Sequence, residues 1–141
     1  MYIQIIIMKV LLSISLLCFA SVFGQSFGQN KVQYRDFDWS FIQTPHFDIY
    51  FYGDEQELAN FTAKVAEEAY EQISLHLRWE LRKRVSIMVY NSHNEFQQTN
   101  IVRPYMSEGV GGVTELFKNR VVFPFEGNYE QFRHVIHHEL V

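Results

Sequence analysis

Two short segments of the chain alternate apolar and polar side chains in the manner of half-buried β-strands. In the first, Phe47, Ile49 and Phe51 occupy alternate positions within residues 46–52, and the pattern recurs over residues 85–89. Alternate residues of a strand face the same side of a sheet, so each segment is predicted to bury one face.

A helical stripe separates these two predicted strands. Its apolar members recur every three or four residues and are Leu58, Phe61, Val65, Ala69, Ile73 and Leu77. Asp54 and Glu57 match a capping box, so we predict an amphipathic helix that begins after Asp54 and continues to about Leu81. A strand, a long helix and a second strand favour a βαβ unit with parallel strands.

The region after the second predicted strand contains another capping box, formed by Ser92 and Glu95. It predicts a short helix through about Asn100, with Pro104 in the following loop. A run of glycines follows, and its members are Gly109, Gly111 and Gly112. Such residues serve a turn or allow another chain to approach the backbone closely, and we favour the turn.

A β-hairpin is predicted after the glycines. Residues 113–117 and 120–123 form its two strands, on either side of Lys118 and Asn119. Pro124 is expected to end the second strand, because proline cannot donate a ladder hydrogen bond.

The last predicted helix begins with Asn128 as its N-cap. Its apolar stripe consists of Tyr129, Phe132, Ile136 and Leu140. At about 100° per residue, His138 falls on the opposite side of the helix and His134 lies close to it. The core can therefore bury one side of this helix while a histidine projects from the other.

Residues 1–24 have the pattern of a secretory signal peptide. Lys9 supplies the positive charge, and a mostly apolar run over residues 10–23 follows it. A membrane anchor is one alternative, but the run is shorter than the roughly 20 residues that span a bilayer. Acylation of Cys18 in a lipoprotein signal is the other. We expect an exported protein of the periplasm or cell envelope.

Composition narrows the class of protein. The 141 residues are 48% apolar and 16% aromatic, which permits a sizeable core. We expect a flexible mature N-terminus over residues 25–40 and one domain over residues 41–141.

The net charge of −4 provides no basic surface, so no nucleic-acid partner is expected. The only cysteine, Cys18, lies in the predicted signal, so any metal would be held by His, Asp or Glu.

Residues 138–141, His-Glu-Leu-Val, match the first four positions of the motif H-E-x-x-H. In that motif two histidines on one helix face hold Zn²⁺, and the glutamate acts as general base on metal-bound water. The second histidine would lie one position beyond Val141. The alternative is an ordinary helix end with surface histidines. His134 and His138 are also four apart, but Val135 leaves no base at the matching offset.

The run over residues 134–141, placed after a hairpin, resembles the active-site helix of the peptidase MA-like group of zinc peptidases, the gluzincins. In detail it is similar to the bacterial envelope subgroup in which such a domain precedes a Tol-type β-propeller. The resemblance implies zinc as cofactor, His138 as a ligand, Glu139 as the general base and a peptide or protein as substrate. The substrate would pair with an edge strand, whose residues are Val113, Thr114 and Glu115. The family pattern includes a second histidine and a downstream glutamate ligand, which would lie beyond these residues.

The expected fold is therefore α+β, a zincin-like N-terminal subdomain with a mixed sheet, a long helix and a C-terminal active-site helix. We expect residues 41–141 to be the front part of a peptidase MA-like domain. The complete domain would be a zinc metallopeptidase, and the part present in this sequence is expected to be inactive. His134 is an auxiliary metal-binding candidate. The alternative is a peptidase-like binding or scaffold module of the cell envelope. We also expect the final turn of the last helix to fray, because its carbonyls lack caps.

Overall fold

The chain divides into two units, which are described separately. The computed structural model describes residues 2–9, 12, 31–100, 107 and 109–141, and the units are Met1–Asn30 and Lys31–Val141. In the first unit, residues 2–9 are helical. Among the described residues, no helix combines the length and apolarity needed to cross a membrane. Most of the predicted signal core lies outside the described residues, so export stays a prediction.

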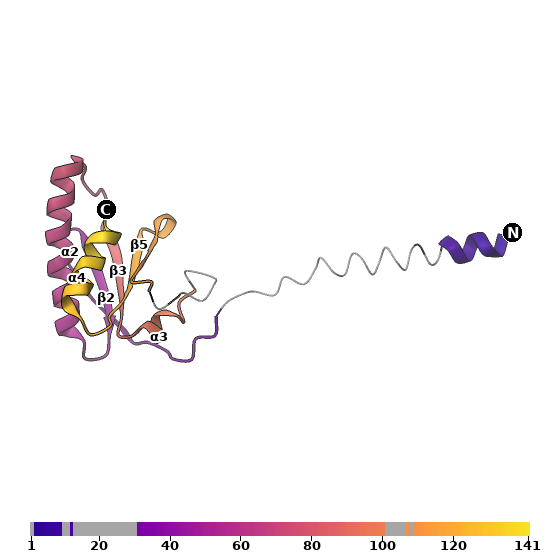
Figure 1. The fold of residues 1–141 in the computed structure, drawn as a ribbon, viewed down its shortest axis with the longest axis horizontal. Helices are drawn as coiled ribbons and strands as arrows, with labels where there is room; N and C mark the ends of the chain where they lie inside the picture. Colours follow the sequence, from indigo (N-terminus) through magenta and orange to yellow (C-terminus); the bar gives the residue numbers. More distant parts are fainter. Residues whose placement is uncertain (1, 10–11, 13–30, 101–106, 108) are drawn as a thin grey trace. The chain divides into compact units, whose positions relative to one another are not determined.

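The second unit is built on a five-stranded mixed sheet with the order β1-β2-β3-β5-β4 (Figure 1). Its strands are β1 (Trp39–Gln43), β2 (Phe47–Tyr52), β3 (Val85–Tyr90), β4 (Val113–Glu115) and β5 (Arg120–Pro124). Strands β2, β3 and β5 run parallel, whereas β1 and β4 pair antiparallel with β2 and β5. The parallel pairing predicted for the βαβ unit is confirmed, and the fold is mixed α+β.

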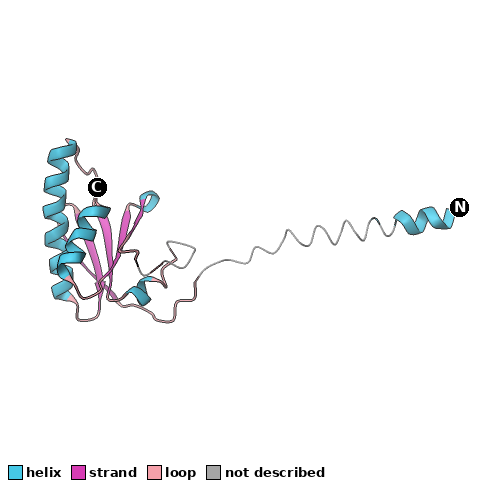
Figure 2. Ribbon diagram, viewed as in Figure 1, coloured by secondary structure: helices cyan, strands magenta, loops and turns pink. Residues whose placement is uncertain are grey.

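Two helices, α2 (Gln56–Leu77) and α4 (Tyr129–Glu139), pack on the same side of this sheet (Figure 2). Leu58 and Val65 of α2 and Phe132 and Ile136 of α4 join alternate residues of the parallel strands in one core cluster. Leu77 and Tyr129, which the predicted stripes also included, are exposed. The strand residues that the alternation predicted to face the core do so. This burial of apolar surface is the main term that holds the helices to the sheet.

The opposite face of the sheet carries a second, largely aromatic cluster. Its buried members are Tyr52, Tyr90, Phe96 and Val122. The short helix α3 (His93–Phe96) contributes one of them. The ring centroids of Phe37 and Trp39 lie 4.4 Å and 5.0 Å from that of Tyr52, so both rings cover the cluster.

Strand β1 and the contacts of the residues before it were not predicted. The Lys31 amide donates to Asn100 Oδ1 at 2.6 Å, and Arg35 forms an ion pair with Glu95 at 2.6 Å. The described part of residues 25–40, the segment predicted to be flexible, is thus connected to the region around α3. None of the β1 residues is fully buried, because it is an edge strand, and its hydrophobic alternation is correspondingly weak.

Helix α2 is shorter at both ends than predicted. Glu55 is its N-cap and no side chain caps the first turn, so the predicted cap at Asp54 is wrong. The helix ends at Leu77, before the predicted Leu81, because Arg78 adopts a left-handed φ of 51°. A left-handed residue after the last turn ends a helix, and here it returns the chain towards the start of β3.

The N-cap of the second predicted capping box is confirmed, since the Glu95 amide donates to Ser92 Oγ at 3.2 Å, and the Ser92 hydroxyl lies 3.2 Å from Glu95 Oε2. Helix α3 nevertheless ends at Phe96, before the predicted Asn100, and gives way to turns. Pro104 lies outside the described residues.

The predicted hairpin is confirmed with a shorter first strand. Strand β4 ends at Glu115 because the next residues form the 3-10 turn η1 (Leu116–Lys118). Asn119 follows with a left-handed φ of 52°, a conformation that asparagine tolerates better than most residues. Pro124 is the last residue of β5, as predicted.

Candidate functional site

Helix α4 is held at its start and along one side. Asn128 Oδ1 accepts hydrogen bonds from the amides of Glu130 at 3.0 Å and Gln131 at 3.1 Å, which confirms the predicted N-cap. Of the four residues in the predicted apolar stripe, Phe132 and Ile136 are buried in the core, Leu140 is half-buried and Tyr129 is exposed. The direction of the helix is thus fixed by its cap and its buried face together.

An ion pair also connects α4 to α2. Arg133 Nη1 donates to Glu68 Oε2 at 2.6 Å, and its guanidinium lies 5.5 Å from the centre of the Phe61 ring. The hydrogen bond from Arg133 holds the pKa of Glu68 below its ordinary value. Because both side chains are partly exposed, we treat this contact as orienting the helices more than stabilising them.

The histidines of the predicted metal-binding face, His134 and His138, are both exposed. A catalytic zinc site normally has three protein ligands. Within the described ranges, no group of three or more His, Cys, Asp or Glu side chains is placed to hold a metal. The donors present therefore do not fit a complete zinc site, and we derive no catalytic step through a metal from these residues alone.

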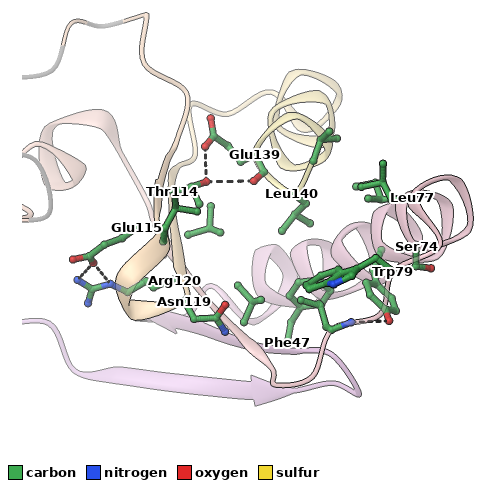
Figure 3. A pocket seen from close by; sticks show the side chains of 17 residues that line it. Phe47, Ser74, Leu77, Trp79, Thr114, Glu115, Asn119, Arg120, Glu139 and Leu140 are labelled. Atoms are coloured by element: carbon green, nitrogen blue, oxygen red, sulfur yellow. Dashed lines mark hydrogen bonds and ion pairs between the residues drawn. The ribbon is translucent and has the colours of Figure 1, made fainter.

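Glu139 is turned towards strand β4. Thr114 Oγ1 donates to Glu139 Oε2 at 2.8 Å and lies 3.3 Å from the Glu139 carbonyl oxygen (Figure 3). The structure thereby brings together the predicted general base and the predicted edge strand. The two residues are 25 positions apart, so no motif or spacing in the sequence could have paired them.

Two of the glycines allow the backbone before β4 to approach α4. A Cβ on Gly111 would lie 2.9 Å from Val135 Cγ2, and a Cβ on Gly112 would lie 2.8 Å from Phe123 Cδ1 and 3.0 Å from Glu139 Cγ. For these two glycines the favoured interpretation as a turn is wrong. The close approach is to a helix and a ring of the same chain, which leaves no room for a side chain.

Strand β4 is an edge strand of the described sheet, as the resemblance implied. Thr114 is exposed, whereas Val113 and Glu115 are half-buried. Partial burial raises the pKa of Glu115, but hydrogen bonds from Lys118 and Arg120 outweigh it and the pKa is lowered overall. Glu115 is therefore committed to ion pairs at 3.0 Å and 2.6 Å within the hairpin.

A pocket of about 230 Å³ opens beside Glu139 and Thr114 (Figure 3). Its walls come from the end of α2, the start of β3, the β4–β5 hairpin and the end of α4. The apolar residues among them include Leu77, Trp79, Leu81, Leu116 and Leu140. Because these elements are far apart in the chain, no pattern of neighbouring residues indicates the pocket.

The other histidines outside α4 are engaged in separate parts of the fold. His46 Nδ1 lies 2.7 Å from Glu67 Oε2, and His93 Nδ1 lies 3.5 Å from Glu126 Oε1. His76 Nδ1 lies 2.6 Å from a backbone carbonyl of its own helix. The contacts of His46 and His76 account for these two side chains, whereas neither ring nitrogen of His93 has a hydrogen-bond partner among the described residues.

Comparison with known proteins adds no relative. No family model, curated protein or solved structure matches the chain. The resemblance to gluzincins thus depends on the residues of α4 and on their surroundings.

Proposed function

We propose that residues 31–141 are the front part of an exported zinc-dependent peptidase domain, in which His138 is one metal ligand and Glu139 the general base. The placement of this pair carries the proposal. One side of α4 is buried, His138 is on the exposed side, and the Glu139 carboxylate contacts the edge strand β4. A ligand, a base and an open strand edge are the parts that peptide hydrolysis needs side by side.

The surroundings support distinct tasks for the two residues. An extended peptide added to the edge of β4 would run past Thr114 and hence past the Glu139 carboxylate. The adjoining pocket could receive one of its side chains. A complete ligand set would hold zinc, which supplies a water of lowered pKa, and Glu139 is the residue to which we assign the role of general base.

A second candidate function is a peptidase-like binding or scaffold module of the cell envelope. Two observations favour it. The described donor set is incomplete, and the apolar side chains of Leu116, Phe117 and Trp79 are 83%, 104% and 57% exposed at the hairpin and beside the pocket. Grouped exposed apolar side chains mark protein contact sites. The edge of β4 would then bind another protein without hydrolysing it.

Zinc stoichiometry tests the proposal. It is measured by calorimetry and elemental analysis on these 141 residues and, if the reading frame continues past Val141, on the continued protein. We expect one tightly bound zinc only in the continued protein, lost in His138→Ala. Retention of zinc in His134→Ala would separate the H-E-x-x-H site from a local pair of His134 and His138.

Hydrolysis of an unstructured protein substrate is the second measurement. Glu139→Gln should keep its zinc and lower the rate by about 10²–10⁴-fold, because it removes the base and leaves the ligands. Absence of zinc from both forms would favour the scaffold module. A zinc-saturated protein that hydrolyses no peptide would contradict the peptidase while leaving the metal site intact.

A further inference from the structure

We infer that Thr114 is a positioning residue, which holds the Glu139 carboxylate against the edge of the sheet with the help of the space left by Gly112. The inference rests on the proposed function, because it concerns the general base assigned there. It adds a residue outside the H-E-x-x-H motif to the machinery of the site.

The hydrogen bond is the first part of the argument. A threonine hydroxyl has one proton, and Thr114 Oγ1 is 2.8 Å from the carboxylate oxygen but 3.3 Å from the carbonyl oxygen of Glu139. The shorter contact has the usual length of a hydrogen bond from a hydroxyl group, whereas the longer one exceeds it. The carboxylate is therefore the principal acceptor.

The space beside Gly112 is the second part. A Cβ at this position would approach Glu139 Cγ to 3.0 Å, which is closer than side chains tolerate without a shift. Gly112 thus leaves room for the methylene groups of Glu139, while Thr114, two residues further along, binds its oxygens. Two positions of one extended segment constrain the same side chain from its middle and its end.

The flexibility of a glutamate side chain gives such a constraint a purpose. Glu139 is only half-buried, and its side chain has three rotatable bonds. A glutamate there would otherwise sample several rotamers, and a misplaced catalytic group lowers the rate of the chemical step. The contact from Thr114 on the sheet removes that freedom.

A structural alternative assigns Thr114 only to the carbonyl, as a cap for the last turn. A double-mutant cycle on the 141-residue chain separates the two cases. Thr114→Val keeps the shape and removes the hydroxyl, and Glu139→Met keeps the side-chain length and removes the carboxylate. We expect Thr114→Val to lower the urea midpoint in the parent chain but not in the Glu139→Met background. Equal shifts in both backgrounds would overturn the inference in favour of the cap.

The catalytic consequence is measured on the zinc-loaded protein that hydrolyses peptide. Thr114→Val should lower kcat by about 10–100-fold with little change in KM or zinc content, and Thr114→Ser, which restores the hydroxyl, should recover most of the rate. An active enzyme whose kcat is the same in the valine and serine variants would overturn the inference. Loss of the proposed function is distinguishable, because it would appear in the parent protein before any substitution.

Discussion

Replacing Gly112 by alanine tests how closely α4 packs against the sheet. The added Cβ would lie 2.8 Å from Phe123 Cδ1 and 3.0 Å from Phe123 Cε1. The Phe123 ring has no exposed surface and packs at 5.8 Å from the ring of Phe132 on α4. Since neither ring can move into solvent, the helix or the backbone before β4 must shift to admit the methyl group.

Two effects of opposite sign set the change in stability. Glycine-to-alanine substitution stabilises a protein by about 0.4–1 kcal/mol where the backbone permits it, because it reduces the entropy of the unfolded chain. Gly112 is not among the described glycines with positive φ, so this gain applies. Overpacking a core opposes it by about 1–3 kcal/mol. We therefore expect a net loss of about 1–2 kcal/mol for Gly112→Ala.

Two neighbouring glycines provide matched controls. Gly111→Ala should lose less, because the Val135 side chain that it meets at 2.9 Å is only half-buried and can shift. Gly109→Ala meets no described atom within 4 Å and should gain up to about 1 kcal/mol. Urea unfolding followed by circular dichroism should place the midpoints in the order Gly109→Ala, parent, Gly111→Ala and Gly112→Ala. Equal midpoints for the three variants would refute the close approach of backbone and helix.

The same assay checks three further expectations, and hydrogen exchange a fourth. Asn128→Ala should lose about 1 kcal/mol of stability, and Asn128→Asp should keep it. Ile136→Ala should lose about 2–5 kcal/mol, because it empties a fully buried site. Burial raises the pKa of Glu67, but hydrogen bonds from Thr44 and His46 lower it overall. The contribution of Glu67 to the free energy of unfolding is therefore complete above the ordinary carboxyl pKa and is lost as the pH falls through the lowered pKa. The urea midpoint of Glu67→Gln should consequently fall less in acid than that of the parent chain. Amides of the last turn of α4 should exchange faster than those of β3, and uniform strong protection to the last residue would contradict fraying.

Features that depend on sequence neighbours could be predicted from the sequence. Ser92 and Asn128 cap their helices because the hydroxyl or amide oxygen reaches an amide two or three residues on, which is a local geometry. The predicted cap at Asp54 is wrong because of another local feature, the turn at Gly53. Gly53 has a φ of 67° and begins a turn, and this turn puts Glu55 at the N-cap instead.

Features that depend on distant residues could not be predicted in this way. Gly111 and Gly112 look like turn glycines in the sequence, and only the packing of α4 shows what their missing side chains admit. The contact between Thr114 and Glu139 likewise requires the register of a helix against a strand. The resemblance placed a substrate edge at Thr114 but gave no reason for it to bind the base.

The packing of α4 against the sheet explains why the adjacent residues His138 and Glu139 have different surroundings. A step of about 100° separates His138 from Glu139, so one is exposed while the other meets β4. The burial of Ile136 and the close approach of Gly112 fix which of them faces the strand. A rotation of the helix by one residue would bring a different side chain to Thr114 and turn the carboxylate away from the strand edge. A substitution that loosens the packing of α4 should therefore change the site even when it touches neither His138 nor Glu139. The Ile136→Ala variant, which empties a buried position on the core side of the helix, tests this separately from the Thr114 contact.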